Sequence, residues 1–145
     1  MTQKKNPEVW PIKGVEVRRF DCHRQPSPQT HQYLTSTEHS VLRGQVVTRE
    51  IARLIKEGFT PNLIFFHVGN GFGLFLRQLI PHTLVVGYTE WWFHDQQSRW
   101  LFDDYSFDRR LLVSMRNGVV LQELEICDRC VTPTQWQWEQ FPAAY

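Results

Sequence analysis

Apolar residues recur along the chain in two patterns, and each pattern predicts a different kind of element. From Thr35 to Lys56 they return every three or four residues, as on one side of an amphipathic helix. The same spacing over Arg109 to Ile126 predicts a second long helix. Continuous apolar runs at Leu63 to Phe66 and Leu84 to Tyr88 predict strands covered on both faces, as in parallel sheets, with a short helix over Leu74 to Ile80 between them. This order indicates an α/β fold with a Rossmann-like parallel sheet flanked by helices.

Capping signals predict where the first long helix begins and ends. Thr35 or Ser36 is placed to cap its start, and Glu38 follows Thr35 by three residues as in a capping box. Gly58 is typical of a helix C-terminus, and Pro61 prevents the helix from continuing. We therefore expect this helix to end just before Gly58.

Weaker patterns predict one more element near each end of the chain. Residues Gly14 to Phe20 alternate valine with charged residues, which is the period of a half-exposed edge strand. Residues 130–131 suggest a brief last strand. After it, Thr132 or Thr134 can cap a terminal helix that runs through Phe141.

Length and composition favour one folded domain. The chain has 145 residues, of which 41% are hydrophobic and 21% are charged, and these values are close to the averages of globular proteins. Residues 1–13 are polar and contain two prolines, so we expect them to form a lead-in to a domain that spans residues 14–145.

Charge and cysteine usage exclude several classes of protein. Sixteen Lys and Arg against fifteen Asp and Glu give a net charge of +1, which offers no general attraction to nucleic acid. No run approaches the roughly 20 apolar residues that span a bilayer, and the opening MTQKKNPEVW lacks the apolar run of a secretory signal. Three cysteines are too few for a disulfide framework. We expect a cytoplasmic protein with reduced thiols and no integral membrane segment.

The first candidate site is the sequence HVGNGFG, from His67 to Gly73, which follows a predicted buried strand directly. Ligands of open α/β sheets bind outside the carboxyl ends of the strands, where glycines let a substrate approach backbone N–H groups. The sequence is not a dinucleotide-binding fingerprint, because Leu74 stands where GxGxxG requires its last glycine. Either a functional site around His67 or a tight turn that binds nothing fits this pattern.

The second candidate is Glu90, which follows the next predicted buried strand and so belongs to the same sheet edge as His67. A carboxylate and an imidazole that converge on one cleft can orient sugar hydroxyls or share a proton. The alternative is an ordinary glutamate that is solvated or paired with an arginine.

Cysteines and aromatic residues give two further possibilities. Cys127 and Cys130 form a CxxC pair, which with Cys22 and His23 would supply four zinc ligands. The CxxC pair alone would be a redox pair, although a thioredoxin-like pair normally precedes a helix and this one follows a predicted helix. The ordinary alternative is small, buried, apolar thiols. Several aromatic residues either stack on sugar rings or belong to the core; these are Trp91, Trp92, Phe93, Trp136 and Trp138. Residues 91–105 show no steady period, which predicts an irregular segment.

From about residue 14 to its end, the chain resembles the N-terminal domain of a bacterial group of family 4 glycosyltransferases, enzymes of the two-domain GT-B architecture. The matching segments are PSPQTHQYL (26–34), VLRGQVV (41–47), GFTPNLIFFHVGNGFGLFLRQLIPH (58–82), GYTEWW (87–92) and the closing CDRCVTPTQWQWEQFPAAY. The combination of TPTQWQ with QFPA is specific, since no general α/β pattern requires it.

The sequence also departs from the family pattern. Around the histidine the family usually has a motif like HPGWGE, whereas this chain has Val68 for the proline, Asn70 for the tryptophan and Phe72 for the acidic residue. The strand, turn and helix with which such domains usually begin have no counterpart here, so the resemblance implies a domain that is incomplete at its start.

The resemblance implies a role for several residues. His67 matches a histidine that faces the donor sugar and holds one of its hydroxyls, and Glu90 matches a position that lines the cleft, so these two are the expected catalytic residues. The positions expected to contact substrate are Gly69, Asn70, Gly71, Thr132 and Thr134. No metal ligands and no cofactor are implied, because most GT-B enzymes are metal-independent and the nucleotide sugar is a substrate.

The resemblance implies the acceptor-side domain of a hexosyltransferase-type enzyme of polysaccharide biosynthesis, which moves a sugar from a nucleotide-sugar donor to a glycan or other acceptor. In the family a C-terminal domain holds most of the nucleotide-sugar site, so this chain is expected to be inactive alone and to need that domain or a companion chain. The alternative is a non-catalytic module that binds a glycan or a protein. An exposed apolar patch and a possible homo-oligomer are expected as well, because a surface that docks on another domain is apolar in part.

Overall fold

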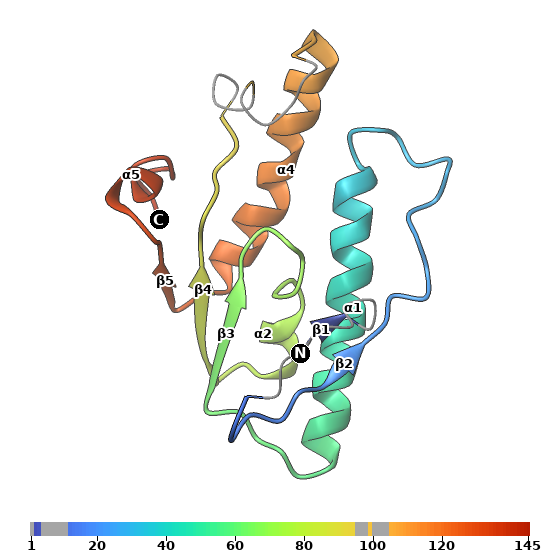
Figure 1. Ribbon diagram of the computed structural model, residues 1–145, viewed down its shortest axis with the longest axis vertical. Coiled ribbons are helices and arrows are strands. Elements are labelled where there is room, and N and C mark those ends of the chain that lie inside the picture. Colours follow the sequence, from blue (N-terminus) through green and yellow to red (C-terminus); the bar gives the residue numbers. More distant parts are fainter. Residues whose placement is uncertain (1, 4–11, 95–98, 100–104) are drawn as a thin grey trace.

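The computed structural model describes residues 2–3, 12–94, 99 and 105–145, and it shows a mixed α/β fold (Figure 1). Two long helices, two short helices, a three-stranded sheet and a small pair of strands make up the described part. The elements in chain order are β1 (Thr2–Gln3), β2 (Arg19–Phe20), α1 (Thr35–Lys56), β3 (Leu63–His67), α2 (Leu76–Leu79), β4 (Leu84–Tyr88), α4 (Phe107–Glu125), β5 (Arg129–Val131) and α5 (Gln135–Trp138).

The main sheet contains β3, β4 and β5 in that order, and all of its strands are parallel. In its register Leu63 is opposite Leu84, His67 is opposite Tyr88, and Gly87 is opposite Cys130. The carboxyl ends of the three strands therefore lie at one edge of the sheet. This arrangement confirms the parallel Rossmann-like sheet expected from the sequence.

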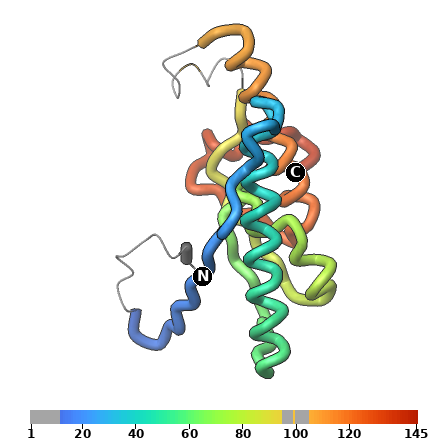
Figure 2. The backbone as a smooth tube through the Cα atoms, turned by 90° about the vertical axis from the view of Figure 1, so that its right-hand side faces the viewer, coloured from blue at the N-terminus to red at the C-terminus, as the bar shows by residue number. Residues whose placement is uncertain are grey.

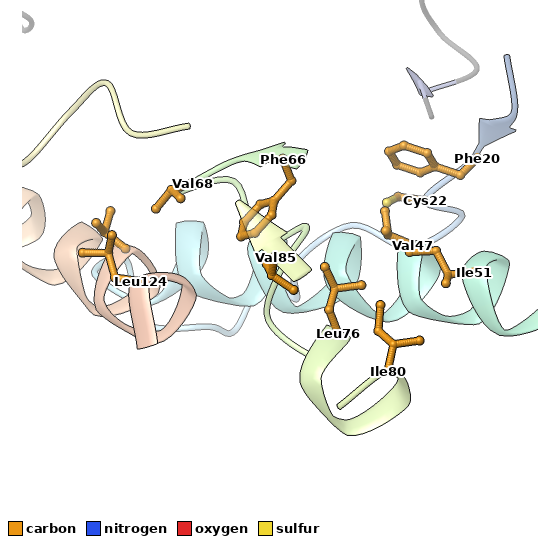
Figure 3. Packing of buried hydrophobic residues seen from close by; sticks show 11 residues of the cluster. Phe20, Cys22, Val47, Ile51, Phe66, Val68, Leu76, Ile80, Val85 and Leu124 are labelled. Atoms are coloured by element: carbon orange, nitrogen blue, oxygen red, sulfur yellow. The ribbon is translucent and has the colours of Figure 1, made fainter. Parts of the chain in front are cut away.

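The core lies between one face of this sheet and the helices. Phe66 of β3 and Val85 of β4 point from the sheet toward Leu76 of α2, as Figure 3 shows. Val47 of α1 and Leu124 of α4 belong to the same buried cluster. Three helices therefore cover this face, because each presents its apolar side to the same two strands.

The opposite face of the sheet is not covered in the described part of the chain. Leu63 and Phe65 of β3 are 50% and 59% exposed, and Leu84 and Val131 on the neighbouring strands are 45% and 48% exposed. The prediction of strands covered on both faces is thus wrong for this structure. The continuous apolar runs reflect one buried face and one open apolar face.

The segment before α1 differs from its prediction. Only Arg19 and Phe20 form a strand, and they pair with β1 rather than joining the main sheet. Gly14 lies in a turn with a φ of 81°, closed by a 3.0 Å hydrogen bond from the Val15 N–H to the Ile12 carbonyl, so no strand can begin there. After β2 the chain runs beside α1 before it enters that helix (Figure 2).

The bounds of α1 are those predicted, but its N-terminus is not capped as expected. Leu34 is the N-cap residue, and no side chain caps it. Glu38 instead accepts hydrogen bonds from the preceding loop, from the Ser27 N–H at 3.1 Å and from the Thr30 hydroxyl. At the other end Gly58 has a φ of 93°, and its N–H donates to the carbonyl of Ile55 at 3.0 Å, which confirms it as the C-terminal signal.

The remaining elements lie close to their predicted positions. Helix α4 begins two residues earlier than expected because the hydroxyl of Ser106 accepts the Arg109 N–H at 3.3 Å. Helix α5 ends at Trp138 rather than Phe141, since Pro142 disfavours a helical conformation at the residue before it. Most of the aromatic segment predicted to be irregular lies outside the described residues. None of the helices in the described part is both long and apolar enough to cross a lipid bilayer.

Candidate functional site

His67 and Glu90 meet at the carboxyl edge of the main sheet. His67 is the last residue of β3, and Glu90 lies two residues beyond the end of β4. The His67 Nε2 atom is 3.0 Å from the Glu90 Oε2 atom. The structure therefore brings together the two residues that sequence reasoning placed first, and it does so because adjacent parallel strands end at the same level.

The second ring nitrogen of His67 has a partner for either protonation state. Its Nδ1 atom is 2.9 Å from the carbonyl oxygen of Val68 and 3.0 Å from the Asn70 side-chain nitrogen. A neutral imidazole with its proton on Nε2 donates to Glu90 and accepts from Asn70. A protonated imidazole donates to both Glu90 and Val68. The ring therefore keeps its orientation while it gains or loses a proton.

Glu90 is held in its ionised form. Hydrogen bonds from His67 and from the phenol of Tyr88 lower the pKa of Glu90 below its ordinary value. The hydrogen bond between Tyr88 and Glu90 also raises the pKa of Tyr88. The side chains of His67 and Glu90 are 40% and 44% exposed, so a ligand can reach both. The Tyr88 ring lies beside the imidazole, with ring centroids 5.5 Å apart. The pair thus offers a carboxylate acceptor and an imidazole ring side by side.

The glycine-rich loop after His67 is closed by a buried carboxylate. The N–H of Gly69 donates to one oxygen of Glu123, and the N–H of Gly73 donates to the other, each over 2.6 Å. Glu123 projects from α4 and is fully buried. Burial raises its pKa, which the hydrogen bonds from the loop partly offset. The amides of Gly69 and Gly73 therefore bond within the protein, and a substrate contact by Gly69, Asn70 or Gly71 stays a prediction.

Two glycines of this loop are required for packing. Gly71 has a φ of 88°, and a Cβ atom added there would lie 2.2 Å from the Ser40 carbonyl oxygen on α1. A Cβ on Gly73 would lie 2.3 Å from the ring of Phe66. The glycines thus let the loop fit between α1 and the sheet, which supports the tight-turn interpretation for Gly71 and Gly73.

Thr132 and Thr134, the threonines expected to contact substrate, follow β5, which pairs with β4 on the side away from β3. Thr134 is the N-cap of α5, and its hydroxyl accepts the Gln137 N–H at 3.2 Å. Gln137 in turn donates from its side chain to the Glu90 carbonyl at 3.0 Å, so α5 is tied to the candidate site. Thr132 is half-buried in the connection to α5. The capping role of Thr134 is confirmed, and a substrate contact by either threonine stays a prediction.

The structure does not support the zinc hypothesis. Within the described residues, which include Cys22, His23, Cys127 and Cys130, no group of three or more His, Cys, Asp or Glu side chains is arranged to hold a metal ion. Cys22 is buried in the core with Phe20, whereas the CxxC pair lies where α4 passes into β5.

Comparison with protein families gives one match that covers the whole chain. A family model described as the glycosyl transferase family 4 group matches residues 1–145. The chain belongs to the glycosyl transferase family 4 group. No curated protein and no solved structure gave a significant match.

Membership of the glycosyl transferase family 4 group supports a transferase-type domain, and the structure explains one of its unusual residues. Phe72, which stands where the family pattern has an acidic residue, packs edge-on against Phe20 with ring centroids 5.9 Å apart. This position therefore contributes to the hydrophobic contact between the loop and the segment before α1, and not to the polar site.

Sequence reasoning missed three polar residues of this family 4 domain. Tyr88 is opposite His67 in the sheet register, Gln137 holds the Glu90 backbone, and Glu123 organises the loop. A signal was present for Glu123, because it follows Val119 by four residues and Val120 by three on the apolar side of its helix. A carboxylate in that position requires a buried partner.

Proposed function

We propose that this chain is the acceptor-side domain of a glycosyltransferase, which moves a sugar from a nucleotide-sugar donor to a glycan or another acceptor. The observation that supports this most directly is the exposed contact between His67 and Glu90 at the carboxyl edge of a parallel sheet. Open α/β sheets bind their ligands at this edge, and the chain belongs to the glycosyl transferase family 4 group.

The chemistry of the pair suits a sugar hydroxyl, which both donates and accepts hydrogen bonds. The Glu90 carboxylate accepts hydrogen bonds from His67, through Oε2, and from the Tyr88 phenol, and its two oxygens have lone pairs left for a ligand hydroxyl. A hydroxyl that donates to Glu90 lies next to the imidazole, which can exchange a proton with it. In this proposal His67 and Glu90 orient the hydroxyl, and the neighbouring Asn70 keeps the imidazole in place.

The proposed enzyme needs a second domain for its donor. We propose that a C-terminal GT-B domain or a companion chain supplies most of the nucleotide-sugar site, and that no metal or other cofactor takes part. Under this proposal the chain alone binds acceptor sugars weakly and does not catalyse sugar transfer. A hexose as the transferred sugar, a role in polysaccharide biosynthesis and a cytoplasmic location belong to the same proposal.

One observation favours the alternative of a binding module. The family's acidic position is occupied here by Phe72, whose ring contacts Phe20. A site that has lost this carboxylate retains the hydrogen-bonding pair of His67 and Glu90, which suffices to bind a glycan without any transfer. The two functions differ in whether addition of the donor-binding domain produces sugar transfer.

Calorimetric titration tests the proposed sugar site. The chain is titrated with short glycans and with uridine and guanosine diphosphate sugars, and wild type is compared with His67→Ala. Loss of one hydrogen bond to a bound hydroxyl weakens affinity by about 1 kcal/mol, or roughly fivefold. We therefore expect a weaker affinity for the bound sugar in the variant.

His82→Ala is the matched control, because His82 is exposed and precedes β4, at the opposite end of the strands. This variant is expected to bind as wild type does. Equal affinities of wild type and His67→Ala, or no binding of any of these ligands to wild type, would contradict the proposed site.

A further inference from the structure

Cys127 and Cys130 place their sulfur atoms against the same glycine of the sheet. Cys127 follows the end of α4, and Cys130 is the middle residue of β5, opposite Gly87 of β4. A Cβ atom on Gly87 would lie 2.7 Å from the Cys127 sulfur and 3.6 Å from the Cys130 sulfur. The missing side chain of Gly87 thus leaves a space that both sulfurs share. Both cysteines are free and half-buried.

The two thiols are chemically unequal. The single S–H of Cys127 can donate to the Glu123 carbonyl oxygen, 3.1 Å from its sulfur, or to the sulfur of Cys130. The hydrogen bond from Cys127 lowers the pKa of Cys130 to about 7. The same contact, together with burial, raises the pKa of Cys127. Near neutral pH a thiolate therefore forms more readily at Cys130 than at Cys127.

We propose that Cys127 and Cys130 form a thiol–disulfide exchange site that reacts with low-molecular-weight disulfides. This site is separate from the His67 and Glu90 pair, and it does not depend on the function proposed above. The sulfurs lie on the helix-covered face of the sheet, beside Gly87, whereas His67 lies on the open face.

The reaction has two steps, and its atoms and electrons balance. The Cys130 thiolate attacks one sulfur of a small disulfide, which forms a mixed disulfide and releases one small thiolate. Cys127 then loses its proton and attacks the Cys130 sulfur, which breaks the mixed disulfide and releases the second small thiolate. Counted from the two thiols, the protein gives up two protons and two electrons, and the small disulfide takes them up to become two thiols.

The contrast with Cys22 provides an internal reference. Cys22 is 7% exposed, and burial raises its pKa. It lies in the core beside Phe20, on the segment that precedes α1. Cys22 is therefore expected to react slowly with a small disulfide under conditions in which Cys130 reacts fast.

Peptide mass mapping after incubation of the whole chain with oxidised glutathione at pH 7 tests the proposal. The free thiols are alkylated after the incubation, and the modified peptides are identified. We expect a disulfide between Cys127 and Cys130, with Cys22 recovered in alkylated form. Recovery of Cys127 and Cys130 alkylated to the same extent as Cys22, with no disulfide between them, would overturn the proposal.

Two variants separate the roles of the sulfurs. In Cys127→Ser the reaction is expected to stop at a glutathione adduct on Cys130, whereas the matched variant Cys22→Ser still forms the internal disulfide.

If Cys127→Ser does not fold, the pH dependence of the alkylation rate of each cysteine in wild type tests the proposal instead. Cys130 is expected to reach half of its maximal rate near pH 7. A profile for Cys130 that coincides with that of Cys22 would rule the proposal out.

Discussion

Glu123 determines the shape of the loop that follows His67. Its two carboxylate oxygens accept the N–H groups of Gly69 and Gly73, and no part of the residue is exposed. Two backbone amides inside the protein thus depend on one side chain from α4. The side chain of Glu123 therefore takes the place that a ligand acceptor would have at these two loop amides.

Substitution of Glu123 with alanine is expected to lower the free energy of unfolding by about 2 to 4 kcal/mol, because the half-buried amide of Gly69 and the buried amide of Gly73 lose their acceptor. The removal of a buried carboxylate offsets part of this loss. Urea denaturation at neutral pH measures the change. Glu125→Ala is the matched control, since Glu125 is exposed at the end of the same helix and its loss is expected to change stability by less than about 0.5 kcal/mol. Equal stabilities of the two variants would refute the structural role of Glu123.

The sequence predicted the main pair of the candidate site but not its surroundings. His67 and Glu90 follow two buried strands, and the rule that parallel strands end at one edge was enough to bring them together. The sequence places Tyr88 only at the end of a strand, whereas its position beside the His67 ring depends on the register between β3 and β4. Register is a property of paired strands, and no single segment of sequence specifies it.

At the scale of elements, α1 and the glycine loop fit together through backbone contacts. A Cβ atom on Gly44 of α1 would lie 2.5 Å from the Gly71 carbonyl oxygen, and one on Gly71 would lie 2.2 Å from the Ser40 carbonyl oxygen. The helix and the loop thus approach each other without side chains between them. This contact places the loop, and with it His67, at a fixed distance from α1.

Replacement of Gly71 with alanine is expected to destabilise the protein by more than about 2 kcal/mol. The new Cβ would collide with backbone, and a φ of 88° strains any residue other than glycine. Gly118→Ala is the opposite control, because no atom lies within 4 Å of its added Cβ and alanine favours the helix by about 1 kcal/mol. Thermal unfolding of both variants should show a lower midpoint for the first and a higher one for the second. A Gly71→Ala variant as stable as wild type would show that the close contact is wrong.

Elements with a regular apolar period along their whole length were predicted well. Strand and helix ends that depend on contacts with neighbouring segments were not. Helix α1 and strand β4 have the predicted bounds, because each has a regular pattern along its whole length. The segment from Gly14 to Phe20 alternates like a strand, yet its beginning forms a turn. The predicted cap of α1 failed because Glu38 binds the preceding loop instead. These outcomes depend on contacts between segments, which local patterns do not contain.

At the scale of the molecule, the sheet has one face buried under helices and one open face. The open face carries exposed apolar side chains, among them Leu63, Phe65, Leu84 and Val131. This face is the exposed apolar patch expected from the sequence, and its exposure in water is unfavourable. Association of the chain with a second copy or with another domain therefore stays a prediction, and the structure gives it a surface.

Among the described residues β3 is the edge strand of the main sheet, and this edge adds to the apolar surface. An apolar groove of about 450 Å³ runs along it, lined in part by Phe20, Ile51, Phe59, Phe65 and Phe72. Residues from the segment before α1, from α1 and from β3 thus contribute to one depression beside the sheet. His67 also borders the groove. Substitutions of groove residues that do not contact His67 should therefore leave the candidate sugar site intact.

The central claim is that His67 and Glu90 form a site for sugar hydroxyls at the carboxyl edge of the sheet. The most direct measurement is a nuclear magnetic resonance titration of the labelled chain with short glycans and nucleotide sugars, which follows the imidazole of His67, the side-chain amide of Asn70 and the backbone amide of Glu90. We predict that these signals shift together as ligand is added, while the imidazole of His82 does not. Shifts confined to the opposite end of the strands, or no shift of His67 with any of these ligands, would contradict the account.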